Sequence, residues 1–208
     1  MPKFPTRILT IPTAITFARL LLVPIVFILI LQNQPEYKLW AFVLFVVAAL
    51  TDFLDGFIAR KTGTVTEFGK AIDPLVDRLL LACGVIALFI VGKLPLWILA
   101  FVILRDAILL TGFAVVNKLR VAEVKIRFVG KVATAALLTG FAALILGFGH
   151  MQQGLGWTYS DAFPGFNLQP YYIGIWFIYL GLVFSLITFV AYLWDGYTLI
   201  RATERRQD

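Results

Sequence analysis

Residues 51–78 read TDFLDGFIARKTGTVTEFGKAIDPLVDR and place four aspartates where two strongly apolar stretches meet. Asp52 and Asp55 are three residues apart and Asp73 and Asp77 are four apart, so each pair occupies one face of a helix. An aspartate well inside a membrane span costs about 2.5–3.5 kcal/mol. Four carboxylates near one depth also repel each other unless cations hold them together. The stretch therefore predicts a functional site at the ends of two consecutive membrane helices.

The rest of the chain has the composition of a membrane protein. Of its 208 residues, 61% are hydrophobic and 14% are charged, whereas about a quarter of the residues of a soluble domain are charged. So much apolar side chain also excludes a disordered chain. The single cysteine excludes a disulfide framework and a cysteine-cluster metal site. Apolar runs of about 18 residues or more favour helices over barrel strands, so we expect an all-α integral membrane bundle.

Six apolar segments are long enough to cross a bilayer, and we expect them to form one domain that covers residues 1–208. The expected transmembrane helices are Ile11–Leu31, Leu39–Phe57, Gly69–Val91, Leu94–Val116, Val129–Phe148 and Tyr171–Leu199. The first segment is too long for a signal peptide and no small-residue cleavage site follows it, so it is interpreted as a retained span.

The basic residues predict how these spans are oriented. Fourteen Lys and Arg residues lie near the start of the first span, near the end of the sixth, or at the second-to-third and fourth-to-fifth connections. The connections on the other side hold only Lys38 and Lys93. Because positive charge marks the cytoplasmic side, both termini and the four aspartates are expected at the cytoplasmic face of a multi-pass cell-membrane protein. The net charge of +6 then belongs to a surface that faces anionic lipids rather than nucleic acid.

The four carboxylates have the chemistry of a divalent-metal site. The connection between the second and third spans is short, so these helices are expected to be antiparallel neighbours whose aspartates face one cleft. Ligation by oxygen alone suits Mg²⁺ or Mn²⁺ and argues against zinc. Two such ions would roughly neutralise four carboxylates, and a two-metal site suits substitution at phosphorus. Small residues between the aspartates leave room for a nucleotide, and Arg60 is well placed for a phosphate.

The same stretch resembles the signature of the CDP-alcohol phosphatidyltransferase family, D-x2-D-G-x2-A-R-x8-G-x3-D-x3-D. All eight fixed positions are matched without a change in spacing, within 26 residues. They are Asp52, Asp55, Gly56, Ala59, Arg60, Gly69, Asp73 and Asp77. A looser resemblance covers nearly the whole chain, because the six spans and the position of the motif between the second and third also fit the family.

This resemblance implies an enzyme that transfers the phosphatidyl group of CDP-diacylglycerol to a polyol or phospholipid acceptor and releases CMP. It implies a two-metal site for Mg²⁺ or Mn²⁺, with Asp77 also acting as the general base for the acceptor hydroxyl. The implied metal ligands are Asp52, Asp55, Asp73 and Asp77. The residues implied to bind the CDP moiety are Asp52, Gly56, Ala59, Arg60 and Gly69. Members of the family are homodimers, so a homodimer is implied as well.

The acceptor is less closely defined by the sequence. Arg105 lies deep in the fourth span, so it should face protein or a water-filled cleft. One interpretation is a structural ion pair of Arg105 with Asp106 or with Asp77. The other is a cationic pocket for an acceptor phosphate, made by Arg105, Lys131 and Arg127. Such a pocket suits glycerol 3-phosphate, and the chain is similar in general appearance to phosphatidylglycerophosphate synthases.

Two departures keep a second acceptor open. Thr13 stands where those synthases usually have Asn, and Arg105 is followed by Asp106 where glycerophosphate-using members commonly have Arg-Glu. The Arg-Asp pair and the run VGKVAT at residues 129–134 also resemble the cardiolipin synthases of the superfamily, whose acceptor is phosphatidylglycerol. An inositol phosphate is a third, less favoured acceptor.

A divalent-cation transporter is the alternative from another class, because carboxylates inside a membrane also mark ion pathways. Against it, the aspartates cluster at one end rather than at the midplane. Only Glu36 and Asp161 are acidic on the expected outer side, too few to line a path. Metal-dependent release of CMP from CDP-diacylglycerol distinguishes an enzyme from a transporter.

Overall fold

A computed structural model describes residues 11–62, 67–119 and 128–204, and in these ranges the chain is mostly helical. The helices are α1 (Ile11–Gln32), α2 (Pro35–Thr62), α3 (Glu67–Ile90), α4 (Leu96–Leu119), α5 (Phe128–Leu146) and α6 (Gly174–Glu204). Two short strands between α5 and α6, β1 (His150–Met151) and β2 (Tyr171–Tyr172), pair antiparallel. The predicted all-α architecture with six long helices is confirmed over the described ranges, and the helix ends differ from the predicted ends by up to five residues.

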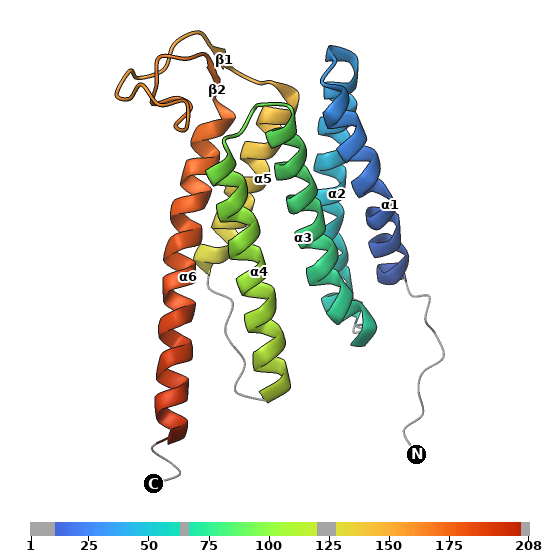
Figure 1. The fold of residues 1–208 in the computed structure, drawn as a ribbon. Coiled ribbons are helices and arrows are strands. Elements are labelled where there is room, and N and C mark those ends of the chain that lie inside the picture. The colour runs from blue at the N-terminus through green and yellow to red at the C-terminus, as the bar shows by residue number, and fades with distance from the viewer. Residues whose placement is uncertain (1–10, 63–66, 120–127, 205–208) are drawn as a thin grey trace.

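The helices alternate in direction along the chain (Figure 1). α1 begins and α6 ends at the lower end of the bundle in this view, whereas β1 and β2 lie at the upper end. The end of α2, the start of α3 and the end of α4 also lie toward the lower end, whereas the lower tip of α5, where that helix starts, is at about mid-height. The helix ends that flank the basic connections are therefore the lower ends of their helices.

The helix ends follow from local backbone chemistry. Asn33 has a φ of 47°, a left-handed conformation that asparagine tolerates, and it ends α1 shortly before Pro35 begins α2. Gly92, with a φ of 72°, follows α3 as in a Schellman motif, in which the Lys93 amide donates to the Leu88 carbonyl. These two turns reverse the chain within a few residues and make α1 and α2, and α3 and α4, sequential neighbours.

Two groups of helices meet in the middle of the bundle. α1 packs against α2 and α3, α5 packs most extensively against α6, and both α2 and α3 contact α5. The core contains fully buried aliphatic and aromatic side chains such as Phe45, Leu81, Ile98 and Phe141. In a lipid environment such contacts stabilise a bundle through close packing rather than through the exclusion of water.

Small residues bring α5 and α6 into direct contact. A Cβ atom at Gly140 would lie 2.6 Å from Ile178 Cγ1 and 3.0 Å from the carbonyl oxygen of Gly174. A Cβ atom at Gly174 would in turn lie 2.8 Å from the carbonyl oxygen of Gly140. No methyl group fits at either position without a shift, so the two backbones touch here, as small residues allow in membrane helix pairs.

Large apolar side chains cover the outside of the bundle. On α6, for example, Val183, Leu186 and Val190 are each more than half exposed. Soluble proteins rarely expose apolar surface on this scale. Among the described residues, Phe128–Leu146 and Gly174–Ala191 are long and apolar enough to cross a membrane. These are features of a membrane-associated helical protein.

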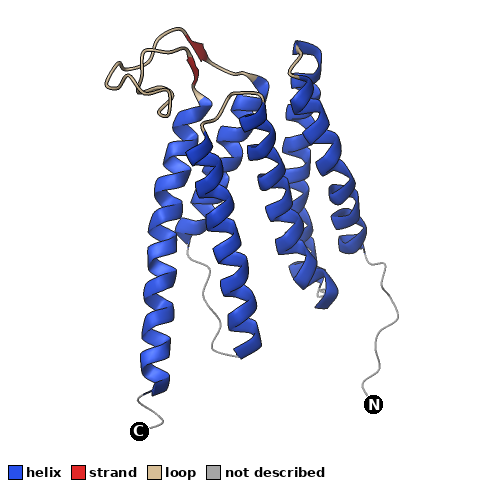
Figure 2. Ribbon diagram, viewed as in Figure 1, coloured by secondary structure: helices blue, strands red, loops and turns tan. Residues whose placement is uncertain are grey.

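The segment between α5 and α6, residues 147–173, forms an irregular structure at the upper end of the bundle (Figure 2). Side chains of two helices hold it in place. The indole of Trp97 in α4 donates to the Ala162 carbonyl, and the hydroxyl of Tyr179 in α6 donates to the Pro164 carbonyl at 2.9 Å. The Trp97 and Tyr179 rings stack on each other beneath this segment.

Lys93, in the turn between α3 and α4, fastens this turn to the end of α5. Its ammonium group donates to the carbonyls of Leu144 and Ile145, two of the groups that a helix leaves without an intrahelical partner at its C-terminus. Burial, together with the charge of Lys38, lowers the pKa of Lys93 to about 8. The upper end of the bundle is thus closed by hydrogen bonds between three helices and a loop.

Replacing Gly140 by valine should destabilise the contact between α5 and α6. The new side chain would meet Ile178 and the backbone of Gly174, and overpacking of this kind typically costs about 1–3 kcal/mol. We expect a lower Tm for Gly140→Val in detergent micelles. Thr139→Leu is the matched control, because it enlarges the residue directly before Gly140, whose side chain is exposed. A Tm equal to that of the wild type in Gly140→Val would show that the helices are not held this closely.

Candidate functional site

The helices that carry the aspartate motif are neighbours. Asp52 and Asp55 belong to the second half of α2, and Asp73 and Asp77 belong to the first half of α3. The two helices contact each other and run in opposite directions (Figure 1). α1 packs against each of them more extensively than they pack against each other. The predicted antiparallel pair is therefore present, with α1 as a third helix beside it.

The structure describes the helical backbone of the motif but not its side chains. The residues concerned are Asp52, Asp55, Gly56, Ala59, Arg60, Gly69, Asp73 and Asp77, and Arg127 lies outside the described residues altogether. Among the side chains that are described, no three His, Cys, Asp or Glu residues come together as a metal site would need. The donor chemistry of the motif, four carboxylates on two neighbouring helices, still fits Mg²⁺ or Mn²⁺.

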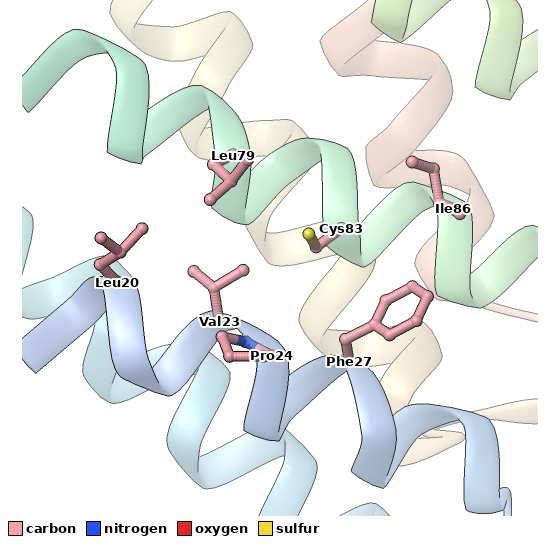
Figure 3. Close-up of a pocket in the computed structure, with 7 residues that line it drawn as sticks. All are labelled: Leu20, Val23, Pro24, Phe27, Leu79, Cys83 and Ile86. Atoms are coloured by element: carbon pink, nitrogen blue, oxygen red, sulfur yellow. The ribbon is translucent and has the colours of Figure 1, made fainter. Parts of the chain in front are cut away.

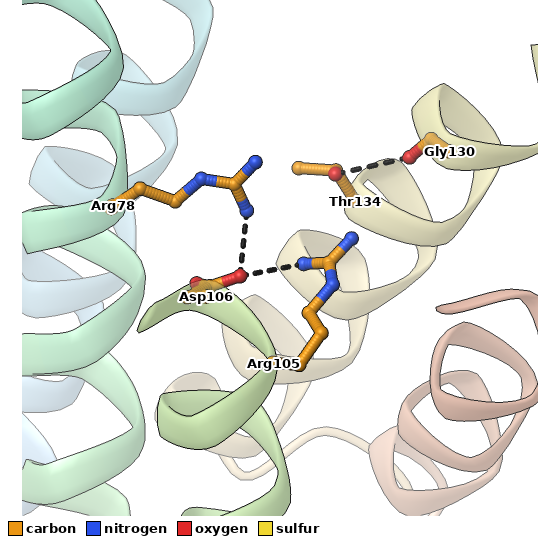
Figure 4. A network of polar contacts seen from close by, with 5 residues as sticks. All are labelled: Arg78, Arg105, Asp106, Gly130 and Thr134. Carbon is orange, nitrogen blue, oxygen red and sulfur yellow. Dashed lines mark hydrogen bonds and ion pairs between the residues drawn. The ribbon is translucent and has the colours of Figure 1, made fainter. Parts of the chain in front are cut away.

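An ion-pair network joins α3 to α4 (Figure 4). Nη1 of Arg78 donates to Oδ1 of Asp106 at 2.7 Å, and Nη1 of Arg105 donates to the same oxygen at 2.9 Å. The side chains of Arg105 and Asp106 are 5% and 9% exposed, and that of Arg78 is 23% exposed. Two guanidinium groups thus share one carboxylate here, and the network joins α3 to α4 through a charged contact that is mostly buried.

The ion-pair network tests part of the prediction for Arg105. Of the two predicted surroundings, protein or a water-filled cleft, this side chain lies in protein, and of the two predicted structural pairs, the one with Asp106 is present. The structure adds Arg78, to which the sequence assigns no role. Its partner is 28 residues away in the chain, so no local spacing pattern could identify the contact. The sequence showed only that Arg78 and Asp106 are both charged and lie within predicted spans, where charged side chains usually pair with each other.

α5 contributes small and polar residues near the network. Thr134 faces the two guanidinium groups (Figure 4), and its hydroxyl donates to the Gly130 carbonyl at 3.1 Å. Lys131, which the sequence predicts as an acceptor ligand, lies in the first turn of α5 with an exposed side chain. Lys131 is therefore not a member of the buried network, and its role in binding the acceptor stays a prediction.

A further arginine is buried on α1. Arg19 is 1% exposed, although the charge pattern counts it with the basic residues of the cytoplasmic flank. α1 packs against both α2 and α3, so this guanidinium enters the interior from the helix next to the motif. Because buried charges are stable only when they are paired and hydrogen-bonded, Arg19 is part of the charged interior of the bundle and not of its surface.

An apolar groove lies between α1 and α3 (Figure 3). Its volume is about 450 Å³. The residues that line it are Leu20, Val23, Pro24, Phe27, Leu79, Cys83 and Ile86. None of these side chains is charged, so the groove can take hydrocarbon but offers nothing to hold a phosphate. Leu79 directly follows Arg78 in the chain, so the groove lies on the same helix as the ion-pair network.

Known proteins are similar to this chain in sequence. Residues 9–187, which include both the motif and the network, match the family described as CDP-alcohol phosphatidyltransferase. The cardiolipin synthase (CMP-forming) of Streptomyces coelicolor is 30% identical over 175 residues, 80% of this chain and 79% of the relative. A CDP-diacylglycerol–glycerol-3-phosphate 3-phosphatidyltransferase of Bacillus subtilis is 34% identical over 148 residues, 65% of this chain and 76% of the relative. The protein of that name from Rickettsia felis is 33% identical over 154 residues, 73% of this chain and 81% of the relative.

Proposed function

Because the chain belongs to the CDP-alcohol phosphatidyltransferase family, we propose that it transfers the phosphatidyl group of CDP-diacylglycerol to glycerol 3-phosphate and releases CMP. The relatives from B. subtilis and R. felis are named for this reaction. The choice of acceptor rests on two neighbouring guanidinium groups, those of buried Arg105 and partly exposed Arg78, because guanidinium groups suit a phosphate such as that of glycerol 3-phosphate.

The motif aspartates are the ligands for divalent metal in this proposal. Asp52, Asp55, Asp73 and Asp77 would hold two ions, Mg²⁺ or Mn²⁺, since carboxylate oxygens are ligands that both metals prefer. When bound, the ions would stabilise the negative charge on the attacking and leaving oxygens. The small side chains of the motif leave room beside them for the nucleotide. The residues assigned to the CDP moiety are Asp52, Gly56, Ala59, Arg60 and Gly69.

The reaction is one substitution at phosphorus. The acceptor hydroxyl gives its proton to Asp77, and its oxygen forms a bond to the lipid-linked phosphorus of CDP-diacylglycerol. The bond from this phosphorus to the oxygen of CMP breaks, and CMP leaves with the bonding electrons. Arg60 compensates charge on the departing phosphate. The residues assigned to the acceptor phosphate from the sequence are Arg105, Lys131 and Arg127, and the structure adds Arg78 next to Arg105.

The apolar architecture fits a lipid donor and a water-soluble product. We assign all six helices as membrane spans of a single domain, with both termini and the motif at the cytoplasmic face of the cell membrane. The donor then enters from the bilayer, where the groove between α1 and α3 offers an apolar surface to hydrocarbon, and CMP leaves to the cytoplasm. A homodimer is the assembly that the family resemblance implies.

Cardiolipin synthesis from phosphatidylglycerol is the second candidate function. The relative from S. coelicolor is named for it. The ion pair between Arg105 and Asp106 favours this acceptor, because the carboxylate removes positive charge from the site. A phosphodiester such as phosphatidylglycerol carries one negative charge and needs less compensation than a phosphate monoester, which carries about two.

Release of CMP by the purified protein tests the function. CDP-diacylglycerol and Mg²⁺ are supplied with either glycerol 3-phosphate or phosphatidylglycerol, and CMP is measured over time. We expect release with glycerol 3-phosphate, its loss when EDTA removes divalent ions, and its return when Mg²⁺ is added in excess. Release with phosphatidylglycerol alone would identify a cardiolipin synthase. Release with neither acceptor, together with uptake of divalent cations into vesicles, would favour a transporter instead.

Asp77→Asn should remove the general base. The amide cannot accept the proton of the acceptor hydroxyl, so we expect the turnover of CMP release to fall by about 10²–10⁴-fold. Asp161→Asn is the matched control, because it makes the same chemical change at an exposed position in the segment at the far end of the bundle. Turnover in Asp77→Asn above about a tenth of the wild-type rate, in a protein with unchanged Tm, would exclude Asp77 as the base.

A further inference from the structure

We propose that the 147–173 segment is an interfacial membrane anchor, which inserts the side chains of Leu155, Trp157 and Tyr159 into the boundary between lipid headgroups and hydrocarbon. Its partner is the lipid at the membrane surface opposite the aspartate motif. The contact is made by apolar and aromatic side chains and does not need anionic lipid. This proposal goes beyond the proposed function, because it concerns the other end of the bundle and does not depend on the reaction.

The first support is the apolar surface of the segment. Trp157 is 80% exposed and Tyr159 is 96% exposed, and the side chains of Phe148 and Leu155 are each more than half exposed. Single exposed apolar residues are common on any protein, but several in one short segment mark an interaction surface. Trp and Tyr are also the residues that gather at membrane interfaces, where one part of the ring is in apolar surroundings and the polar group is in water.

The second support is the position of the segment between two apolar helices. Among the described residues, the stretches long enough to cross a membrane are Phe128–Leu146 and Gly174–Ala191. The first ends directly before the segment and the second begins directly after it. A helix of this length extends about 27 Å, close to the hydrocarbon thickness of a bilayer of about 30 Å. Both attachments of the segment therefore lie where hydrocarbon gives way to headgroups.

The third support is the shape of the segment. It folds back on itself, since the backbone amide of Trp157 donates to the Phe166 carbonyl at 2.8 Å, and the hydrogen bonds of Trp97 and Tyr179 fasten it to α4 and α6. These bonds satisfy backbone groups, as irregular structure at membrane depth requires. The segment extends sideways past the upper end of α6 (Figure 1). In this position it meets the lipid around the bundle.

The charge of the segment defines the kind of lipid contact. Residues 147–173 include no Lys or Arg, and Asp161 is their one acidic residue. Attachment to anionic lipid uses clusters of Lys and Arg, which the segment lacks. Burial of apolar side chains proceeds equally well in a membrane of zwitterionic lipid. The segment is therefore expected to enter the interface whatever the charge of the headgroups.

Spin labelling of the full-length protein tests the anchor. Cys83, the only cysteine of the sequence, is changed to alanine, and a nitroxide is attached at Tyr159→Cys, where the nearly full exposure leaves room for it. Cys83→Ser serves if Cys83→Ala does not fold. In nanodiscs of phosphatidylcholine, electron paramagnetic resonance measures collisions of the label with oxygen, which concentrates in lipid, and with a neutral nickel chelate, which stays in water.

The matched control is a label at Gln34→Cys, in the exposed turn between α1 and α2 at the same end of the bundle. We expect the ratio of oxygen collisions to nickel collisions to be several-fold higher at Tyr159→Cys than at Gln34→Cys. Adding phosphatidylserine to the nanodiscs should leave this ratio unchanged. Trp157→Ser should lower the ratio at Tyr159→Cys, whereas Trp157→Phe, which keeps an aromatic ring, should preserve most of it.

Three results would overturn the proposal. The first is an equal ratio at Tyr159→Cys and at Gln34→Cys, because the segment would then lie in water. The second is protection of the label from both reagents together with dipolar broadening of its spectrum, because a second copy of the chain would then cover the segment. The third is a high ratio that requires phosphatidylserine, because the contact would then be electrostatic. An unchanged ratio in Trp157→Ser would overturn the assignment of Trp157.

Discussion

Charged groups inside an apolar bundle are stable only when they form ion pairs and hydrogen bonds with one another. This requirement determines how the charged side chains in the interior of the protein are arranged. Asp106 shows it most directly, because its carboxylate accepts hydrogen bonds from arginines on two helices. Removing one member of such a group leaves the others buried without compensation, which costs more than any single contact is worth. The packing of α3 against α4 is thus tied to a polar contact that a purely apolar interface would not need. The same requirement applies to Arg19, buried on α1 beside the two helices of the motif.

The opposite end of the bundle has a different construction. There α5 and α6 touch through Gly140 and Gly174, and Trp97, Tyr179 and Lys93 bond to backbone carbonyls of the loop and of α5. These contacts are short-range and largely neutral, so they hold the helices together but do not position charged groups for chemistry. The charged contacts and these neutral contacts therefore lie at different heights along the same helices. For a lipid-modifying enzyme this separation is useful, because the hydrocarbon of the donor needs apolar surface such as the groove between α1 and α3, whereas its phosphates need the charged level.

Much of this arrangement could be predicted from the sequence, because it depends on short-range patterns. The six helices follow from apolar runs, and the pairing of α2 with α3 follows from the short connection between them. The contact of Arg78 with Asp106 could not be predicted, because it depends on how α3 and α4 rotate about their axes. The burial of Arg19 could not be predicted either, because counting charges does not separate an arginine that reaches the membrane surface from one that turns inward. The shape of the groove depends on packing in the same way.

Counting bound ions tests most directly whether the carboxylates of α2 and α3 form one two-metal site. Mn²⁺ is titrated into the purified full-length protein, and the free ion is followed by electron paramagnetic resonance. Two ions per chain are expected at saturation, as a two-metal site for phosphoryl transfer requires. Asp73→Asn should lose at least one of them, and Asp161→Asn should keep both. Saturation below one ion per chain, or unchanged binding in Asp73→Asn, would contradict a shared metal site and with it the assignment of the motif as the catalytic centre.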